Sequence, residues 1–301
     1  MNQTSINRAD VRTRFIFDDM PVRGLHVRLE NVWQHIVKQK NYPSAIRRAL
    51  GELLAAGVLL SGNLKNEGTL IVQIQGQGRL KMLVAEATSD RTVRATARWD
   101  ETAEIADDES LGDLLGEGGV FVLTLQPKDG EPWQGVVPLE GGSIAQMLAN
   151  YMKRSEQIDT HIVLSASGEA AGGLLVQRLP EAEADEAWEH VSTLARTLTA
   201  EELAGLDAQH VLYRLFHETP PRVFEPETFE FSCTCSRGKV SDMLLMLGGE
   251  EVGGVVAEQG SIEVDCDFCH SKYVFDETDV NALFGADVVG VAREQSRHTV
   301  Q

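Results

Sequence analysis

The chain has 301 residues, 43% of them apolar, which is enough for one large domain and one small domain. Its 27 basic and 46 acidic residues give a formal net charge of −19, which would repel phosphate backbones and disfavours nucleic acid as a partner. The N-terminal segment is polar, and the longest apolar run, Leu53 to Leu60, is far shorter than the ~20 residues of a membrane-spanning helix. We therefore expect a cytoplasmic protein without a membrane anchor.

Residues 1–178 are predicted to form a single α/β core domain. The segment from Arg14 to Leu29 alternates apolar and polar residues around a central turn, which indicates two strands. After Pro43, Ser44 is placed to cap a helix whose apolar residues recur at helical spacing from Ile46 to Leu59.

Three more hairpins and one helix are predicted in this domain. Gly76-Gln77-Gly78 lies between two apolar runs, and its glycines are expected where the turn needs positive φ. The other paired runs and the helix are Val120 to Leu125 with Gly135 to Leu139, Ile158 to Leu164 with Gly173 to Gln177, and Ser143 to Lys153. We interpret all of these stripes as core packing, and we expect no enzyme activity.

Residues 179–230 are predicted to form a helical linker of high like charge, with twelve acidic and three basic residues. Two apolar stripes indicate two amphipathic helices, separated by a capping box at Thr199-x-x-Glu202, and a proline-rich strap follows. Helices of this length depend on docking their apolar face. The linker is therefore either an ordinary docked segment or a metastable one that is released when its docking surface is lost.

Residues 231–287 contain all four cysteines, as Cys233-x-Cys235 and, thirty residues later, Cys266-x-x-Cys269. Four thiolates are the ligand set of a closed tetrahedral zinc site, so one Zn²⁺ is predicted here. A disulfide within Cys-x-Cys would close a small, strained ring, and strained disulfides are the labile, regulatory ones. A short helix is expected around Met243 to Leu247, with turns at the pairs Gly248-Gly249 and Gly253-Gly254, and residues 288–301 form a predicted polar tail.

The side chains near the cysteines have two interpretations each. Arg237, Lys239 and Lys272 either moderate the negative charge of the site or are simply solvated. Phe268, Tyr273 and Phe275 either shield the sulfurs or form a small aromatic core. His270 follows Cys269 directly, but with four sulfurs present we interpret it as a bystander rather than a ligand.

The residues from Phe231 to Arg237, with Cys266-x-x-Cys269 followed by Tyr273 and Phe275, resemble the redox-switch domain of the 33 kDa heat-shock protein family. Leu70 to Glu86 resembles a hairpin of the family's core domain, and the similarity runs the length of the chain. The resemblance implies an α+β protein with a large core domain, a helical linker and a small zinc-binding domain.

The same resemblance implies a stress-response chaperone of the cytoplasm, an ATP-independent holdase that is inactive when reduced and zinc-bound. Oxidants would form the disulfides Cys233–Cys235 and Cys266–Cys269, zinc would leave, and the protein would dimerise and hold unfolding client proteins. The residues expected to bind clients lie on the linker stripes: Trp188, Leu194, Leu198, Leu203, Leu212 and Phe216.

Three alternatives remain open from the residues. A zinc ribbon that binds nucleic acid or a polymerase is disfavoured by the net charge of −19. A thiol-disulfide oxidoreductase using Cys266-x-x-Cys269 would need a strand before the motif and a helix after it, and neither is evident in the sequence. A purely structural zinc module would keep its metal when treated with peroxide.

Overall fold

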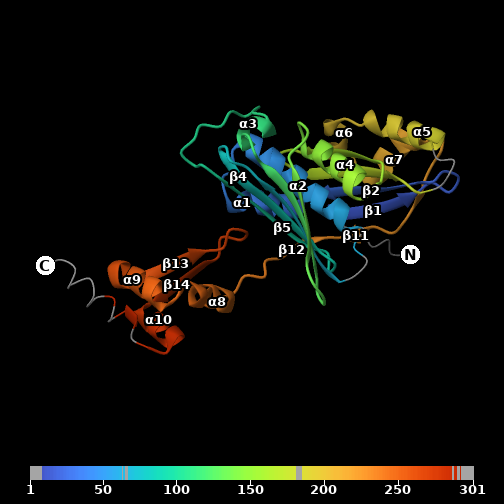
Figure 1. Cartoon of the computed structure of the whole chain (residues 1–301). Helices are drawn as coiled ribbons and strands as arrows, with labels where there is room; N and C mark the ends of the chain where they lie inside the picture. The colour runs from blue at the N-terminus through green and yellow to red at the C-terminus, as the bar shows by residue number, and fades with distance from the viewer. Residues whose placement is uncertain are drawn as a thin grey trace, which may run out of the picture. The chain divides into compact units, whose positions relative to one another are not determined.

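The computed structural model describes residues 9–62, 64, 67–180, 185–286, 288, 289 and 292 (Figure 1). The chain forms two compact units, Met1–Ser232 and Cys233–Gln301, which are described separately below. No helix in the described part of the chain has both the length and the apolar character to span a bilayer.

Two sheets build the N-terminal unit. The first contains β1 (Asp10–Ile16), β2 (Val22–Leu29), β8 (Thr160–Ala166) and β9 (Ala171–Arg178), with the short strands β10 (Arg222–Val223) and β11 (Glu227–Thr228) both pairing with β1. The second has the order β12-β5-β4-β3-β6-β7. Its strands are β3 (Gly68–Gln75), β4 (Leu80–Thr88), β5 (Thr92–Trp99), β6 (Val120–Pro127), β7 (Trp133–Pro138) and β12 (Glu230–Phe231). All pairings are antiparallel except that of β12 with β5.

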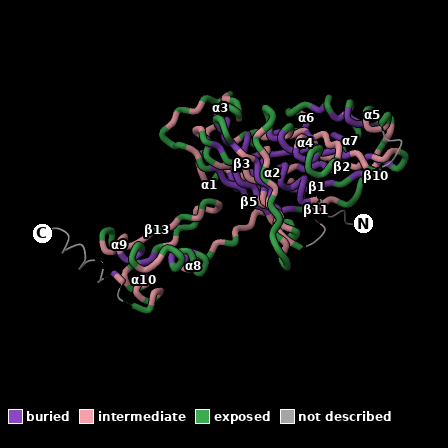
Figure 2. Tube along the Cα trace, in the orientation of Figure 1, coloured by how far each residue is buried: buried purple, intermediate pink, exposed green. Residues whose placement is uncertain are grey.

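The helix α2 (Ser44–Ser61) packs between the two sheets and is buried along most of its length (Figure 2). The remaining helices of this part are α1 (Asn31–Gln39), α3 (Leu111–Leu115) and α4 (Ile144–Ser155). The predicted cap at Ser44 is wrong: Pro43 precedes the helix, Ser44 is its first residue, and no side chain caps it.

All four predicted hairpins of this unit are confirmed, but the reason given for Gly76 and Gly78 is wrong. Neither has positive φ. A Cβ on Gly76 would lie 2.4 Å from the Leu80 carbonyl oxygen, and one on Gly78 would lie 2.5 Å from the Leu114 carbonyl oxygen. The glycines are therefore needed because the backbone at the end of α3 passes directly over the turn and, for Gly76, because the first carbonyl of β4 lies equally close.

The linker contains three helices rather than the predicted two: α5 (Asp185–Arg196), α6 (Ala200–Gly205) and α7 (Ala208–Phe216). The capping box of Thr199 and Glu202 is confirmed at the start of α6. The second predicted helix is divided because the Asp207 carboxylate accepts a hydrogen bond from the His210 amide and begins a new helix. Residues 181–184 of the predicted linker lie outside the described residues.

These linker helices cover the face of the first sheet that α2 does not contact. Their apolar residues form a cluster with Phe15, Phe17 and Val22 of the sheet's first hairpin and with Leu174 and Val176 of β9. Figure 1 shows α5, α6 and α7 together on this side of β1 and β2. The N-terminal unit is therefore layered as sheet, α2, sheet and linker.

The C-terminal unit contains α8 (Arg237–Leu247), α9 (Gly249–Gln259), a hairpin of β13 (Ser261–Asp265) and β14 (Lys272–Asp276), and α10 (Glu277–Phe284). The helix around Met243 is confirmed, and Gly248 turns the chain with φ of 95°. The predicted turn at Gly253-Gly254 is wrong, because both residues lie inside α9. Val289 is buried in this small core, beyond the predicted end of the module at 287. Of the predicted tail 288–301, only residues 288, 289 and 292 are described.

Candidate metal centre

The four cysteines come from two places in the C-terminal unit. Cys233 and Cys235 precede α8, whose first turn is capped by the Ser236 hydroxyl accepting from the Lys239 amide. Cys266 follows β13 directly, and Cys269 lies in the turn before β14. That turn is closed by backbone hydrogen bonds from the Cys266 amide to the Ser271 carbonyl, 3.0 Å, and from the His270 amide to the Cys266 carbonyl, 2.8 Å.

The four sulfurs form a single cluster, all within 4.8 Å of one another. The Sγ atoms of Cys233 and Cys266 are 3.6 Å apart, and those of Cys235 and Cys269 are 3.3 Å apart. None of these four cysteines forms a disulfide in this structure. Sulfurs bound tetrahedrally at about 2.3 Å from zinc would be about 3.8 Å apart, so the cluster needs only small shifts to hold the ion.

Hydrogen bonds distinguish the sulfurs from one another. The Tyr273 hydroxyl donates to Cys235 Sγ at 3.1 Å, and this contact raises the pKa of Tyr273 to about 12. Burial raises the pKa of the Cys266 thiol to about 12. Burial acts in the same sense on Cys269, but the Ser271 hydroxyl, 3.2 Å away, and the Ser271 backbone favour the thiolate and lower its pKa to about 6. Bound zinc would favour the thiolate form of every ligand.

Two of the nearby cations, Arg237 and Lys272, are paired with carboxylates rather than directed at sulfur. The Arg237 guanidinium donates to the Val274 carbonyl, forms an ion pair with Asp279 at 2.7 Å and lies 4.1 Å from the centre of the Phe275 ring. Lys272 pairs with Glu263 at 2.8 Å. For Arg237 and Lys272 the structure therefore does not support the charge-moderating role.

The aromatic residues have divided roles. Phe275 is buried in the core of the unit, which agrees with the interpretation of these aromatic residues as core residues. Tyr273 does more than shield the sulfurs, because its hydroxyl is a hydrogen-bond donor to one of them. Sequence reasoning missed this donor and Ser271. The alternation of β14 was the available signal, since it places Tyr273 and Phe275 on one face of the strand.

His270 is not part of the sulfur cluster, which among the described residues consists of the four cysteines alone. It contributes its backbone amide to the turn and adopts positive φ, 53°. This agrees with the bystander interpretation.

One argument against an oxidoreductase was wrong: a strand, β13, does precede Cys266. The helix that follows, α10, comes only after β14, so the strand–motif–helix order is still not met.

The predicted client-binding residues all lie in the N-terminal unit and all face the cluster beneath the linker helices. Leu198, Leu203, Leu212 and Phe216 are buried there, and Trp188 and Leu194 are half-buried against it. In this docked arrangement none of the six is an exposed apolar side chain. Whether they bind clients stays a prediction.

Comparisons with known proteins agree on one family. The sequence profile of the family described as Hsp33 protein matches residues 10–276. Proteins named 33 kDa chaperonin are 94% identical to the chain in Neisseria meningitidis serogroup A, over the full length of both, and 55% identical in Chromobacterium violaceum, over 98% of this chain and all of that one. The crystal structure of the 33 kDa chaperonin of Thermotoga maritima is similar with a TM-score of 0.81 and 26% identity, covering 92% of this chain and 98% of that one.

Proposed function

Because this chain belongs to the Hsp33 protein family, whose curated members are named chaperonins, we propose that it is a redox-regulated, ATP-independent holdase of the cytoplasm. The observation that carries the proposal is the cluster of four cysteine sulfurs within 4.8 Å of one another. These residues, Cys233, Cys235, Cys266 and Cys269, would hold one Zn²⁺. When bound, the ion would keep the thiolates deprotonated and cross-link the two half-sites.

The thiolates are also the groups that an oxidant attacks. Peroxide oxidises one sulfur to a sulfenic acid, and a second thiolate displaces hydroxide from it to form a disulfide. Each disulfide removes two ligands, so the site can no longer hold its metal. The small core around Val240, Leu244 and Phe275 buries little apolar surface, and a unit of this size depends on its metal to stay folded.

The family implies that the disulfides are Cys233–Cys235 and Cys266–Cys269. The two short sulfur–sulfur distances instead join one half-site to the other, so distance alone does not select this pairing. Mass spectrometry of the oxidised protein tests it. Cys266→Ser should block the second pair and still allow Cys233 to join Cys235. A native disulfide across the thirty-residue spacer would contradict the assignment.

Loss of the folded module is proposed to release the linker helices and to uncover the apolar cluster beneath them. Trp188, Leu194, Leu198, Leu203, Leu212 and Phe216 would then contact unfolding clients, and the oxidised chain would dimerise. Contiguous apolar surface binds non-native chains, and the acidic residues of the linker would keep the complex soluble.

The deciding experiment follows zinc release with a chromophoric chelator together with light scattering from a heat-unfolding client, before and after hypochlorous acid or warm peroxide. We expect zinc loss and suppressed scattering to appear together and to reverse with a thiol reductant. Zinc retained after oxidation, or scattering that does not change, would return the module to a purely structural role.

A further inference from the structure

A histidine is buried between the first sheet and the linker. His26 lies on β2, directly opposite Thr13 of β1 and Leu174 of β9. Side chains directly opposite one another in a sheet share a face, and Leu174 belongs to the cluster covered by the linker helices. His26 therefore faces the linker. It is 0% exposed, and neither ring nitrogen has a hydrogen-bond partner among the described residues.

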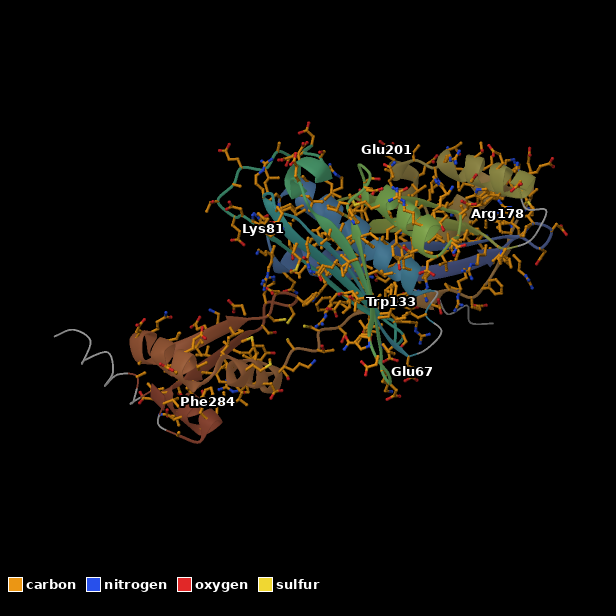
Figure 3. All side chains as sticks on the ribbon, in the orientation of Figure 1. Glu67, Lys81, Trp133, Arg178, Glu201 and Phe284 are labelled. Atoms are coloured by element: carbon orange, nitrogen blue, oxygen red, sulfur yellow. The ribbon has the colours of Figure 1, made fainter. Side chains whose placement is uncertain are left out.

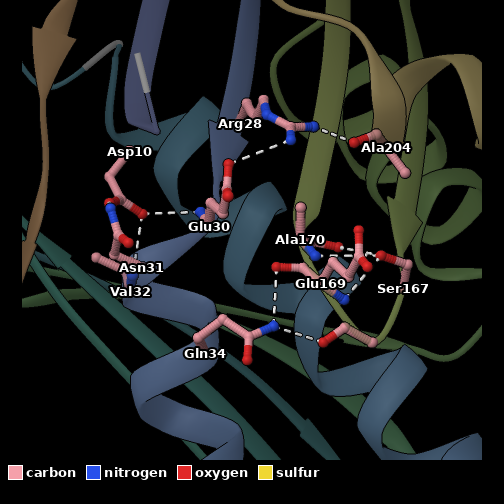
Figure 4. Close-up of polar contacts among 11 residues, drawn as sticks. Asp10, Arg28, Glu30, Asn31, Val32, Gln34, Ser167, Glu169, Ala170 and Ala204 are labelled. Carbon is pink, nitrogen blue, oxygen red and sulfur yellow. Dashed lines mark hydrogen bonds and ion pairs between the residues drawn. The ribbon is translucent and has the colours of Figure 1, made fainter. Parts of the chain in front are cut away.

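The corner between α6 and α7 covers this part of the sheet. Arg28, two residues along β2 on the same face, donates a hydrogen bond to the Ala204 carbonyl of α6, as Figure 4 shows. The Leu203 carbonyl lies 3.1 Å from the position that a Cβ on Gly172 would occupy, and Gly172 pairs with Arg28. With this corner in place the His26 ring is closed off from water.

The charges around His26 are few and opposed. Asp207 at the start of α7 favours the protonated ring, and Arg28 disfavours it. Each of these is itself paired, Asp207 with His210 at 2.8 Å and Arg28 with Glu30 at 3.2 Å. Other charged groups on the packed elements include the pair of Glu202 with Arg214 between α6 and α7, and His161 of β8 near Arg196 of α5. Glu186, Glu189 and His190 of α5 and Glu201 of α6 are exposed.

We propose that His26 acts as a proton-sensitive latch: its protonation disfavours docking of α5, α6 and α7, so that acid releases the linker without oxidation of the cysteines. A protonated ring in this position would be a buried cation with no acceptor, whereas in the released state it would be hydrated. The effect on docking is independent of the cysteines, and its consequence for chaperone activity rests on the proposed function.

The size of the effect follows from the two states of the ring. Burial lowers the pKa of His26 from 6.5 to about 4 in the docked state. Because the docked pKa is the lower one, docking is fully favourable above pH 6.5 and weakens as the pH falls from 6.5 toward 4. Between pH 7.5 and pH 5, the ratio of docked to released linker should fall about 30-fold through this residue alone. His161, whose pKa is also lowered by burial, would add to the change in the same direction.

Hydrogen–deuterium exchange of the amides of α5 to α7 tests the latch in the full-length, reduced, zinc-loaded protein, with exchange rates corrected for their intrinsic pH dependence. We expect linker opening to rise about 30-fold more between pH 7.5 and pH 5 in the wild type than in His26→Leu. His190→Gln, a change at an exposed residue of α5, is the matched control and should behave as the wild type. Equal pH dependence in the wild type and His26→Leu would overturn the proposal.

A measurement on the wild type removes any dependence on the variant folding. An NMR titration of the His26 ring should give a pKa near 4, and a value of 6 or above would overturn the latch. Chelator measurements at both pH values check that zinc stays bound. If the linker opens at pH 5 but the protein does not suppress client light scattering, the proposal for His26 is supported and the proposed client-binding surface is contradicted. Failure of one proposal can therefore be distinguished from failure of the other.

Discussion

Phe216→Ala should release the linker in the reduced, zinc-bound protein. Phe216, on the last turn of α7, is 1% exposed. Its ring centre lies 5.1 Å from that of Phe17, edge to face, and 6.2 Å from that of Phe15. Truncating a buried phenylalanine costs about 3–5 kcal/mol, part of which comes from such aromatic pairs. Because this cost falls on docking, it corresponds to roughly a 150- to 5,000-fold lower ratio of docked to released linker.

Hydrogen–deuterium exchange of the α5 to α7 amides measures this ratio, and client light scattering without oxidant measures its consequence. The matched control is Tyr213→Ala on the same helix, where the side chain is 74% exposed. A change at such a position should alter stability by no more than about 0.5 kcal/mol. If the two variants show the same linker protection, the apolar face of α7 does not hold the linker on the sheet, and the reasoning fails.

Three further predictions concern other contacts. A zinc chelator should abolish the helical signal of α8 to α10 in circular dichroism, because structural zinc contributes on the order of 10 kcal/mol to such units; an unchanged spectrum would show that the module folds by itself. Tyr273→Phe removes the donor to Cys235 and should weaken zinc binding roughly tenfold in a chelator competition, whereas unchanged affinity would mean that the hydroxyl has no part in the site. Gly76→Ala should destabilise the N-terminal unit by about 1–3 kcal/mol in urea, since its Cβ would clash with the Leu80 carbonyl. Gly112→Ala in α3 is the control, because its Cβ would meet only the Ser110 hydroxyl at an ordinary contact distance of 3.8 Å; equal losses would refute the clash.

Elements whose signal is local were predictable. The hairpins between β3 and β4 and between β8 and β9 follow from apolar runs and turn residues, and the four metal ligands follow from cysteine spacing. The sequence analysis missed β5 because charged residues interrupt its apolar pattern. One of them, Arg94, lies opposite Glu86 of β4 and forms an ion pair with it at 2.7 Å. That pairing depends on sheet register, which one segment of sequence does not reveal.

Contacts between distant segments were not predictable for the same reason. The second apolar stripe of the linker predicts one continuous helix. Only the hydrogen bond from the His210 amide to the Asp207 carboxylate shows why one helix ends and another begins there. The requirement for Gly78 arises from the backbone of residues 114–116, almost forty positions away in the sequence. Exposure is similarly non-local: Trp133, labelled in Figure 3, lies on the edge strand β7. It is 48% exposed, so its emission would add to that of Trp188, and a fluorescence assay of linker release needs a variant in which Trp188 is the only tryptophan left.

The position of the linker would let it leave the sheet, as proposed, while the rest of the unit stays folded. α2 contacts both sheets and cannot move without breaking the main core, whereas the linker helices bury only one face against the outside of one sheet. An ion pair between Arg178 and Asp185 links the start of α5 to β9, but Asp185 is 85% exposed, and such pairs contribute little.

Both ends of the linker stay fixed to the same sheet. On one side β9 pairs with β2, and on the other β11 pairs with β1. The second attachment is strong: the buried Arg12 guanidinium donates to Glu227 at 2.8 and 3.0 Å and to the Val58 carbonyl and Ser61 hydroxyl of α2, each at 2.7 Å. A released linker would therefore be a loop closed at both ends, with much less entropy to lose on redocking than a free segment. Under the proposed mechanism, reversal after reduction would need no refolding of the sheets, only the return of α5, α6 and α7 to a face that has kept its shape.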